Sequence, residues 1–198
     1  LIGKDTRKSG DMLEAALTAG MCSVGAKVIP LGVIPTPAVA YLTRLYKADA
    51  GVVISASHNP CEYNGIKFFN SEGYKLSDSV EDEIEAYIRA EKKMNDLPTH
   101  GKVGYVSANH NAVEDYVNFA CSTIDCDLRG MKIAIDCANG ASYQTAFKAL
   151  NKLGANVEAI HNTPDGVNIN AKCGSTHMES LQSYVTSIGA DIGLAFDG

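Results

Sequence analysis

The 198-residue chain carries 17 Lys and Arg residues against 23 Asp and Glu residues, a formal net charge of −6, and 45% of it is hydrophobic. This acidic balance argues against nucleic acid or an anionic membrane as the main partner, because both attract basic surfaces. No apolar run approaches the roughly 20 residues of a membrane-spanning helix. An anionic ligand would need local cations to offset the overall negative field.

Strand and helix patterns alternate through the first half of the chain. Apolar residues at spacings of three and four predict a helix that begins at Ser9. A short strand follows at residues 28–31, and Thr36-Pro37 marks the start of a second helix. Residues 51–55 are predicted to form a strand that is buried on both faces, because three large apolar residues follow one another.

A turn and a further helix follow this strand. Asn64-Gly65 is a turn signal, and residues 66–69 are expected to form a strand that pairs back toward the preceding loop. Ser79 with Asp82 resembles a capping box, which would open a helix. Four apolar residues of this helix are expected to be buried: Val80, Ile84, Tyr87 and Ile88.

The second half repeats the alternation. We interpret the charged stretch at residues 89–102 as the end of a first domain. The later elements are strands at 132–136, 156–160 and 192–196, helices at 142–153 and 179–188, and a polar loop at 161–177. The pattern predicts two three-layer α/β/α domains with mixed, largely parallel sheets, divided into residues 1–107 and 108–198.

Polar residues follow three of the predicted strands, and ligands gather at the carboxyl ends of strands in such sheets. These exits are residues 55–58, 136–140 and 197–198. Ser57 could be a nucleophile, a phosphate-binding hydroxyl or a loop residue that satisfies backbone groups, and the residues alone favour the last. Lys67 could act as acid or base, or be a solvated strand lysine. Asp197 alone is one carboxylate, and Asp136 is interpreted as a turn residue.

The cysteine and histidine patterns indicate no site by themselves. None of the six cysteines forms a CxxC pair, which favours reduced cysteines in a cytoplasmic protein over a disulfide framework or a zinc site. Four histidines lack ligand spacing and are interpreted as surface residues: His100, His110, His161 and His177.

The stretch "ISASHNPCEYNGIKFF" (residues 54–69) resembles the phosphoserine loop of the α-D-phosphohexomutase family. Four further stretches agree in order: "GKDTRKSG", "VIPTPAVAYL", "DCANGASY" and "GLAFDG". The resemblance therefore extends over essentially the whole chain. Within the family, the run from Asn170 to His177 is similar to the phosphoglucosamine branch rather than to the phosphomannose and phosphoglucose branch.

The resemblance implies a reversible phosphoryl shift between glucosamine 6-phosphate and glucosamine 1-phosphate, through a phosphoserine and a bisphosphate intermediate. This reaction would serve UDP-N-acetylglucosamine and cell-wall precursor synthesis, with glucosamine 1,6-bisphosphate or a similar sugar as activator. Two alternatives stay open. The first is a phosphomannomutase or phosphoglucomutase, and the second is a non-catalytic α/β protein that binds sugar phosphates.

The resemblance also implies residue roles. Ser57 would carry the phosphoryl group, and one Mg²⁺ would be held by the Ser57 phosphate and Asp197. The other catalytic candidates are His58, Lys67 and Arg7, the last with a partly structural role. The substrate-binding candidates are Asn59, Asn64 and Gly65.

The sequence departs from the family at its ends. The family's metal loop reads Asp-Gly-Asp-Gly-Asp-Arg, whereas here only Asp197-Gly198 are present. An upstream arginine-glycine loop and the family's third and fourth domains are also missing. We therefore expect a fragment with little activity alone, whose partners are a hexosamine phosphate and those two domains. A cytoplasmic location, no nucleic-acid or membrane partner, and a homodimer as one candidate assembly complete the expectations.

Overall fold

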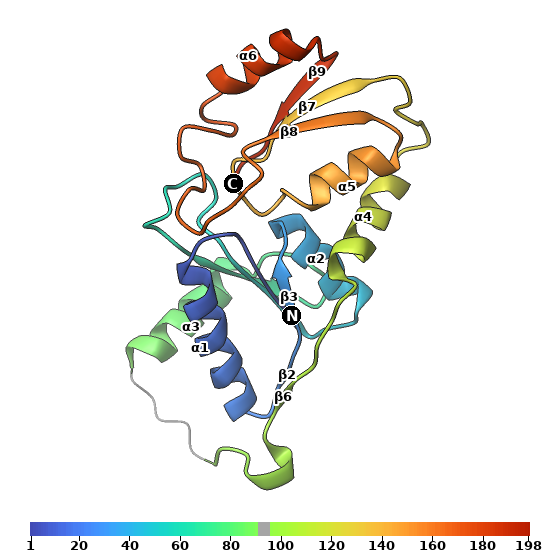
Figure 1. The fold of residues 1–198 in the computed structure, drawn as a ribbon. Helices are drawn as coiled ribbons and strands as arrows, with labels where there is room; N and C mark the ends of the chain where they lie inside the picture. The colour runs from blue at the N-terminus through green and yellow to red at the C-terminus, as the bar shows by residue number, and fades with distance from the viewer. Residues whose placement is uncertain (91–95) are drawn as a thin grey trace.

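The first sheet has four strands and is mixed. The computed structural model describes residues 1–90 and 96–198 (Figure 1). The strands lie in the order β3 (Pro30–Val33), β1 (Ile2–Lys4), β4 (Ala50–Ile54) and β5 (Ile66–Asn70). β1 pairs in parallel with β3 and β4, and β5 is antiparallel to β4. The predicted return of the chain after the Asn64-Gly65 turn is therefore confirmed.

Helices cover both faces of this sheet. Helix α1 (Ser9–Ser23) packs on the face that carries Val52 and Ile54, and α2 (Thr36–Leu45) packs on the face that carries Val53. All three strand residues are at most 1% exposed. Their consecutive burial follows from the alternation of side chains along a strand that has a helix on each side.

The predicted strand at residues 28–31 is two strands in the structure. β2 (Lys27–Val28) pairs with β6 (Tyr105–Val106), and β3 pairs with β1. Between them, the carbonyl of Ile29 accepts a hydrogen bond from the N–H of Ile2. Pro30 has no N–H to continue the first ladder, so the chain passes from one sheet to the other at this point.

Helix α3 (Asp78–Arg89) differs from the prediction in two ways. None of its residues is buried, and Val80 and Ile88 are 39% and 68% exposed. Its N-cap is Ser77, with no side-chain capping bond, so the predicted capping box is wrong. An amphipathic pattern sets which face of a helix is apolar, but burial of that face requires a partner surface. Residues 91–95 of the predicted domain end lie outside the described residues.

The second sheet is parallel throughout, in the order β8 (Asn156–Ile160), β7 (Lys132–Asp136) and β9 (Ile192–Ala195). Helix α5 (Thr145–Lys152) packs against one face, and α6 (Glu179–Ile188) lies on the other (Figure 1). Helix α4 (Ala112–Ser122) contacts both α2 and α5. A short 3₁₀ helix, η1 (His100–Lys102), precedes β6.

The predicted fold class is confirmed, because both of the larger sheets have helices on their two faces and most strand pairs are parallel. The predicted bounds of β7, β8 and α6 agree with the structure. Within the described residues, no helix combines the length and apolar character that crossing a membrane requires.

Candidate functional site

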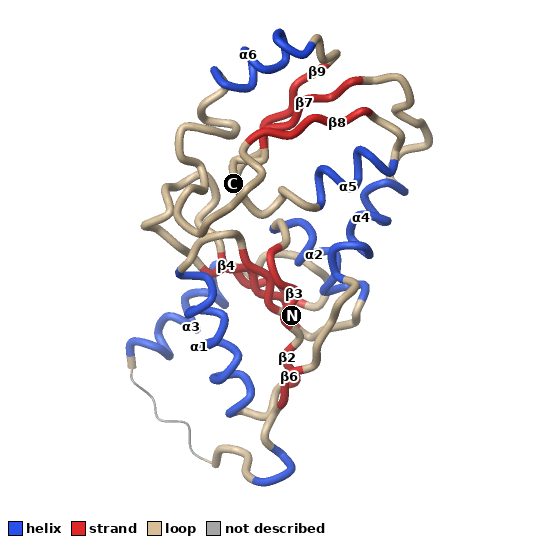
Figure 2. Tube along the Cα trace, in the orientation of Figure 1, coloured by secondary structure: helices blue, strands red, loops and turns tan. Residues whose placement is uncertain are grey.

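The polar segments that follow β4, β7 and β9 meet at one edge of the molecule, which we call the Ser57 edge. The loop after β4 reaches the segment after β9, and the Ser57 Oγ donates a hydrogen bond to the Asp197 Oδ2 at 2.9 Å across 140 residues of sequence. The loops that form this edge lie between the two sheets, close to the C-terminus (Figure 2). The carboxyl ends of the two sheets therefore face each other, and they bring together the two residues that were assigned to phosphate and metal.

Ser57 occupies a constrained backbone position. Its φ is +56°, in the left-handed region that residues with a side chain seldom adopt. Its N–H donates to the Oγ of Ser55 at 3.1 Å. Such a conformation persists only where the surroundings determine it, and it orients the Ser57 hydroxyl toward the second sheet.

Hydrogen bonds from Arg7 fix much of the backbone conformation of the Ser57 loop. Its buried guanidinium binds the Asp5 carboxylate through Nε at 2.9 Å. Its terminal nitrogens donate to three backbone carbonyls of the loop, those of Ser57 at 2.8 Å, Asn59 at 2.9 Å and Pro60 at 2.5 Å. A buried charge needs pairing, and the planar fork of arginine matches several acceptors at once. Arg7 thus holds the Ser57 loop from within.

Asn170 contacts the same loop from the second unit, meaning the β8-β7-β9 sheet with its helices and loops; the first unit is the four-stranded sheet with its helices and loops. Its Nδ2 donates to the carbonyls of Ser57 at 2.9 Å and Asn59 at 3.1 Å. Its own N–H donates to the carbonyl of Ala138. The sequence singled out Asn170 only as part of a motif, and its contact with Ser57 was missed. The one available signal was an amide in a long polar loop, a class of loop that is often functional.

Further bonds join the two units near Ser57. The Thr6 Oγ1 donates to the carbonyl of Asn139 at 2.5 Å, and the Lys8 N–H donates to the carbonyl of Gly166 at 2.9 Å. A Cβ on Gly140 would lie 2.2 Å from the carbonyl carbon of Gly198. The segment after β7 therefore packs directly against the segment after β9. Only glycine fits at position 140.

His58 and Lys67 carry the nearby basic groups. His58 is exposed in the Ser57 loop, and Lys67 is half-buried on β5 opposite Val53. Directly opposite residues of an antiparallel pair point to the same face, so Lys67 projects from the face that α2 covers. Neither side chain forms a hydrogen bond or ion pair with another described residue, which leaves both available to a ligand.

Asn64 and Gly65 form the turn that leads from the Ser57 loop into β5. The Asn64 Nδ2 donates to the Ser9 Oγ at 2.9 Å, and its Oδ1 accepts from the Gly65 N–H at 2.9 Å. A Cβ on Gly65 would lie 3.0 Å from the Ser55 carbonyl oxygen. These contacts tie the loop to the start of α1. Asn59, in contrast, has an exposed side chain.

Asp136 is fully buried at the end of β7. Its Oδ1 accepts from the Ala138 N–H at 2.9 Å and its Oδ2 from the Gly174 N–H at 3.0 Å, which is the turn role expected of it. Burial, and then the charge of Asp136, raise the pKa of the Cys137 thiol to about 12 and that of the Cys173 thiol to about 11. All six cysteines are free, so no disulfide joins these segments.

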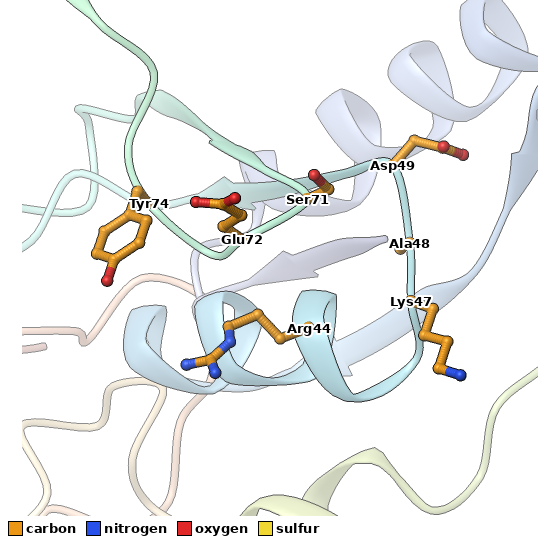
Figure 3. Close-up of a pocket in the computed structure, with 7 residues that line it drawn as sticks. All are labelled: Arg44, Lys47, Ala48, Asp49, Ser71, Glu72 and Tyr74. Carbon is orange, nitrogen blue, oxygen red and sulfur yellow. The ribbon is translucent and has the colours of Figure 1, made fainter.

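A cavity of about 620 Å³ lies at the opposite end of the first sheet (Figure 3). Its lining comes from the end of α2, the segment before β4 and the turn after β5, and it includes Arg44, Lys47, Asp49 and Glu72. These four side chains are exposed and of mixed charge. Ser57 follows the carboxyl end of β4, whereas this cavity adjoins its amino end, so the two are separate features.

Comparison with known proteins gives the family. Residues 1–95 match the sequence model of phosphoglucomutase/phosphomannomutase alpha/beta/alpha domain I, and residues 110–198 match that of domain II. The chain belongs to this family. The two matched segments each contain one of the two larger sheets, so the phosphoglucomutase/phosphomannomutase assignment and the fold agree.

Relatives within the family are considerably longer than this chain. It is 62% identical to the phosphoglucosamine mutase of Clostridium acetobutylicum and 64% identical to that of Ruminiclostridium cellulolyticum. Each match covers all of this chain but only 44% of the relative, so the chain spans less than half the length of these proteins.

A solved phosphoglucomutase/phosphomannomutase family protein from Burkholderia thailandensis has a similar fold. It superposes with a TM-score of 0.82 at 24% identity, over all of this chain and 43% of its own. At 24% identity, this similarity supports a shared fold only.

Proposed function

We propose that this chain forms the first two domains of a phosphoglucosamine mutase, residues 1–107 and 108–198, which interconverts glucosamine 6-phosphate and glucosamine 1-phosphate. The observation that carries the proposal is the 2.9 Å hydrogen bond between the Ser57 Oγ and the Asp197 Oδ2. The identity of 62–64% to proteins named phosphoglucosamine mutase supports the choice of sugar.

The donor set at this contact suits magnesium. A serine phosphate and the Asp197 carboxylate offer oxygen ligands, and Mg²⁺ prefers oxygen ligands that it shares with a phosphate. Asp197 is exposed, and its Oδ2 is the oxygen that accepts the hydrogen bond from Ser57. When bound, the ion would supply positive charge to the transferring phosphoryl group.

In the proposed reaction, the phosphoryl group moves between Ser57 and the sugar. The bond between phosphorus and the Ser57 Oγ breaks, and a bond forms to a free hydroxyl oxygen of the hexosamine phosphate. The hydroxyl proton passes to a base, for which Lys67 is our candidate, and the released Ser57 Oγ takes up a proton that it gives up again in the return step. The resulting bisphosphate reorients and returns its other phosphoryl group to Ser57. Transfer of this kind depends mainly on alignment and charge stabilisation.

The other proposed roles follow from where the side chains lie. His58 and the Asn59 side chain are exposed in the Ser57 loop and can meet a phosphate or a sugar hydroxyl. Arg7 acts as a positioning residue, because its guanidinium nitrogens bind Asp5 and loop carbonyls. Asn64 and Gly65, expected as substrate-binding residues, would act by shaping the loop.

The test uses the full-length protein that carries this chain, incubated with glucosamine 1,6-bisphosphate and Mg²⁺. We expect one phosphoryl group on Ser57 by peptide mass spectrometry, and its loss in Ser57→Ala together with a fall in kcat of about 1,000-fold or more. Ser71→Ala, in the exposed turn after β5, is the matched control and should keep both. Full turnover by Ser57→Ala would rule out the mechanism.

Sugar choice is tested separately. We expect kcat/KM for glucosamine phosphates to exceed that for mannose and glucose phosphates, and the reverse order would favour a phosphomannomutase or phosphoglucomutase. Binding without phosphorylation would favour the non-catalytic alternative. Because the chain spans 44% of its relatives, residues 1–198 alone should show little turnover.

A further inference from the structure

A second group of potential metal ligands lies in the second unit, at the ends of β7 and β8 and in the loop that follows β8. Asp136 ends β7, His161 follows β8, and Cys173 lies in the loop of residues 161–177. One ligand atom from each lies within 4.8 Å of the other two. Asp136 and Cys173 are 0% exposed, whereas the His161 side chain is 31% exposed although its Nδ1 is buried.

Two of the three ligand residues, His161 and Cys173, have a potential ligand atom without a hydrogen bond, whereas both Asp136 oxygens accept backbone hydrogen bonds. The His161 Nδ1 is buried without a hydrogen-bond partner, although the Asp136 Oδ2 lies only 3.0 Å away. Among the described residues, the Cys173 Sγ also has no hydrogen bond. Buried polar atoms without a partner are rare in native proteins and call for a physical explanation. The sequence interpretation of His161 as a surface residue is therefore corrected at this atom.

The separations suit a tetrahedral ion. With metal–ligand distances of about 2.0–2.3 Å, tetrahedral ligand atoms lie about 3.3–3.8 Å apart. The Nδ1–Oδ2 separation of 3.0 Å is close to this, and the Cys173 sulfur lies within 4.8 Å of the other two ligand atoms. Imidazole and thiolate ligands select zinc-like ions over magnesium, which takes oxygen ligands.

We propose that Asp136, His161 and Cys173 bind a divalent transition-metal ion of the zinc class, with the fourth ligand position left to a ligand from outside the chain. Cysteine spacing did not indicate this site, because its ligands come from three separate segments. It differs in place and in chemistry from the oxygen ligands proposed at Ser57 and Asp197.

Metal binding here would stabilise the segments of the second unit that contact the Ser57 loop. The ion would join the ends of β7 and β8 to the loop that carries Asn170, three residues before Cys173. Asn170 binds the Ser57 and Asn59 carbonyls, and the Gly174 N–H already binds Asp136. Occupancy should therefore raise the melting temperature, since an ion that binds only the folded chain stabilises it.

The experiment titrates the reduced, metal-stripped chain with Co²⁺, whose visible spectrum reports tetrahedral geometry. We expect about one equivalent to bind, with a thiolate-to-cobalt charge-transfer band that Zn²⁺ removes and excess Mg²⁺ does not. Cys173→Ser should abolish that band, and His161→Gln should weaken binding by about tenfold or more. Cys126→Ser, at an exposed cysteine, should match the parent chain.

Two results would overturn the proposal: an undiminished charge-transfer band in Cys173→Ser, or Co²⁺ affinity that His161→Gln leaves unchanged. If the buried Cys173 substitution prevents folding, the half-exposed His161 decides alone. The readouts are spectroscopic and do not involve Ser57, so failure of this site leaves the proposed mutase function standing.

Discussion

The two units of the molecule contact each other in two regions of opposite character. The Ser57 edge is polar, and its contacts are hydrogen bonds from Asn170 and Thr6 to backbone carbonyls and from Ser57 to Asp197. The helix layer formed by α2, α4 and α5 is aromatic. There the Tyr41 and Phe119 rings stack with centroids 3.8 Å apart and an interplanar angle of 13°.

The two contact regions are expected to differ in how well they tolerate amino-acid substitutions. Hydrogen bonds to fixed carbonyls require donors in set positions, whereas apolar packing accepts apolar side chains of similar volume at modest cost. We therefore expect conservative substitutions to fail at the Ser57 edge and to succeed in the helix layer.

The largest effect is expected at Arg7. Arg7→Lys keeps the charge but cannot reach Asp5 and three carbonyls at once, so it should lower the free energy of unfolding by about 2–4 kcal/mol. It should also increase amide exchange in residues 55–60. Urea unfolding and hydrogen exchange measure the two effects, with the exposed Arg129→Lys as control. Parent-like stability in Arg7→Lys would mean that the guanidinium fork is dispensable.

A smaller effect is expected at Phe119, in the helix layer. Phe119→Leu should cost about 1 kcal/mol or less and Phe119→Ala about 1–2 kcal/mol, because the ring stacks on Tyr41 but is 37% exposed. Urea unfolding gives both values. Phosphorylation of Ser57 in the full-length protein should be unchanged in both variants, and its loss would show that the two regions are coupled.

The smallest effect is expected at Tyr46, whose hydroxyl donates to the Asp115 carboxylate at 2.5 Å and joins α2 to α4. Burial, and then this hydrogen bond, raise the pKa of Tyr46 to about 12, above the unfolded value of about 10. The bond's contribution is therefore complete below about pH 10 and is lost as pH rises toward about 12.

Tyr46→Phe tests this pH dependence. The stability difference from the parent should be about 1 kcal/mol or less, constant from about pH 7 to pH 9, and should shrink above about pH 10. Urea unfolding at several pH values measures it. A difference that grows with alkaline pH would contradict the assigned direction.

Much of the fold could be predicted because it depends on local pattern. Val52, Val53 and Ile54 indicated a strand covered on both faces, and the polar exits after β4 and β9 indicated residues that meet at a sheet edge. Helix α3 shows the limit. Its apolar stripe was visible, but whether Val80 and Ile88 are buried depends on a surface that their sequence does not encode.

By itself, the sequence determined the alternation of strands and helices, the phosphohexomutase motifs and the candidate pair Ser57 and Asp197. Only the tertiary structure decided that Arg7 turns inward to loop carbonyls, that Asn170 reaches Ser57 from the second unit, and that His161 and Cys173 meet at Asp136. Each of these contacts joins segments that lie apart in the chain. Such contacts depend on how two sheets pack, and residue spacing carries no information about that packing.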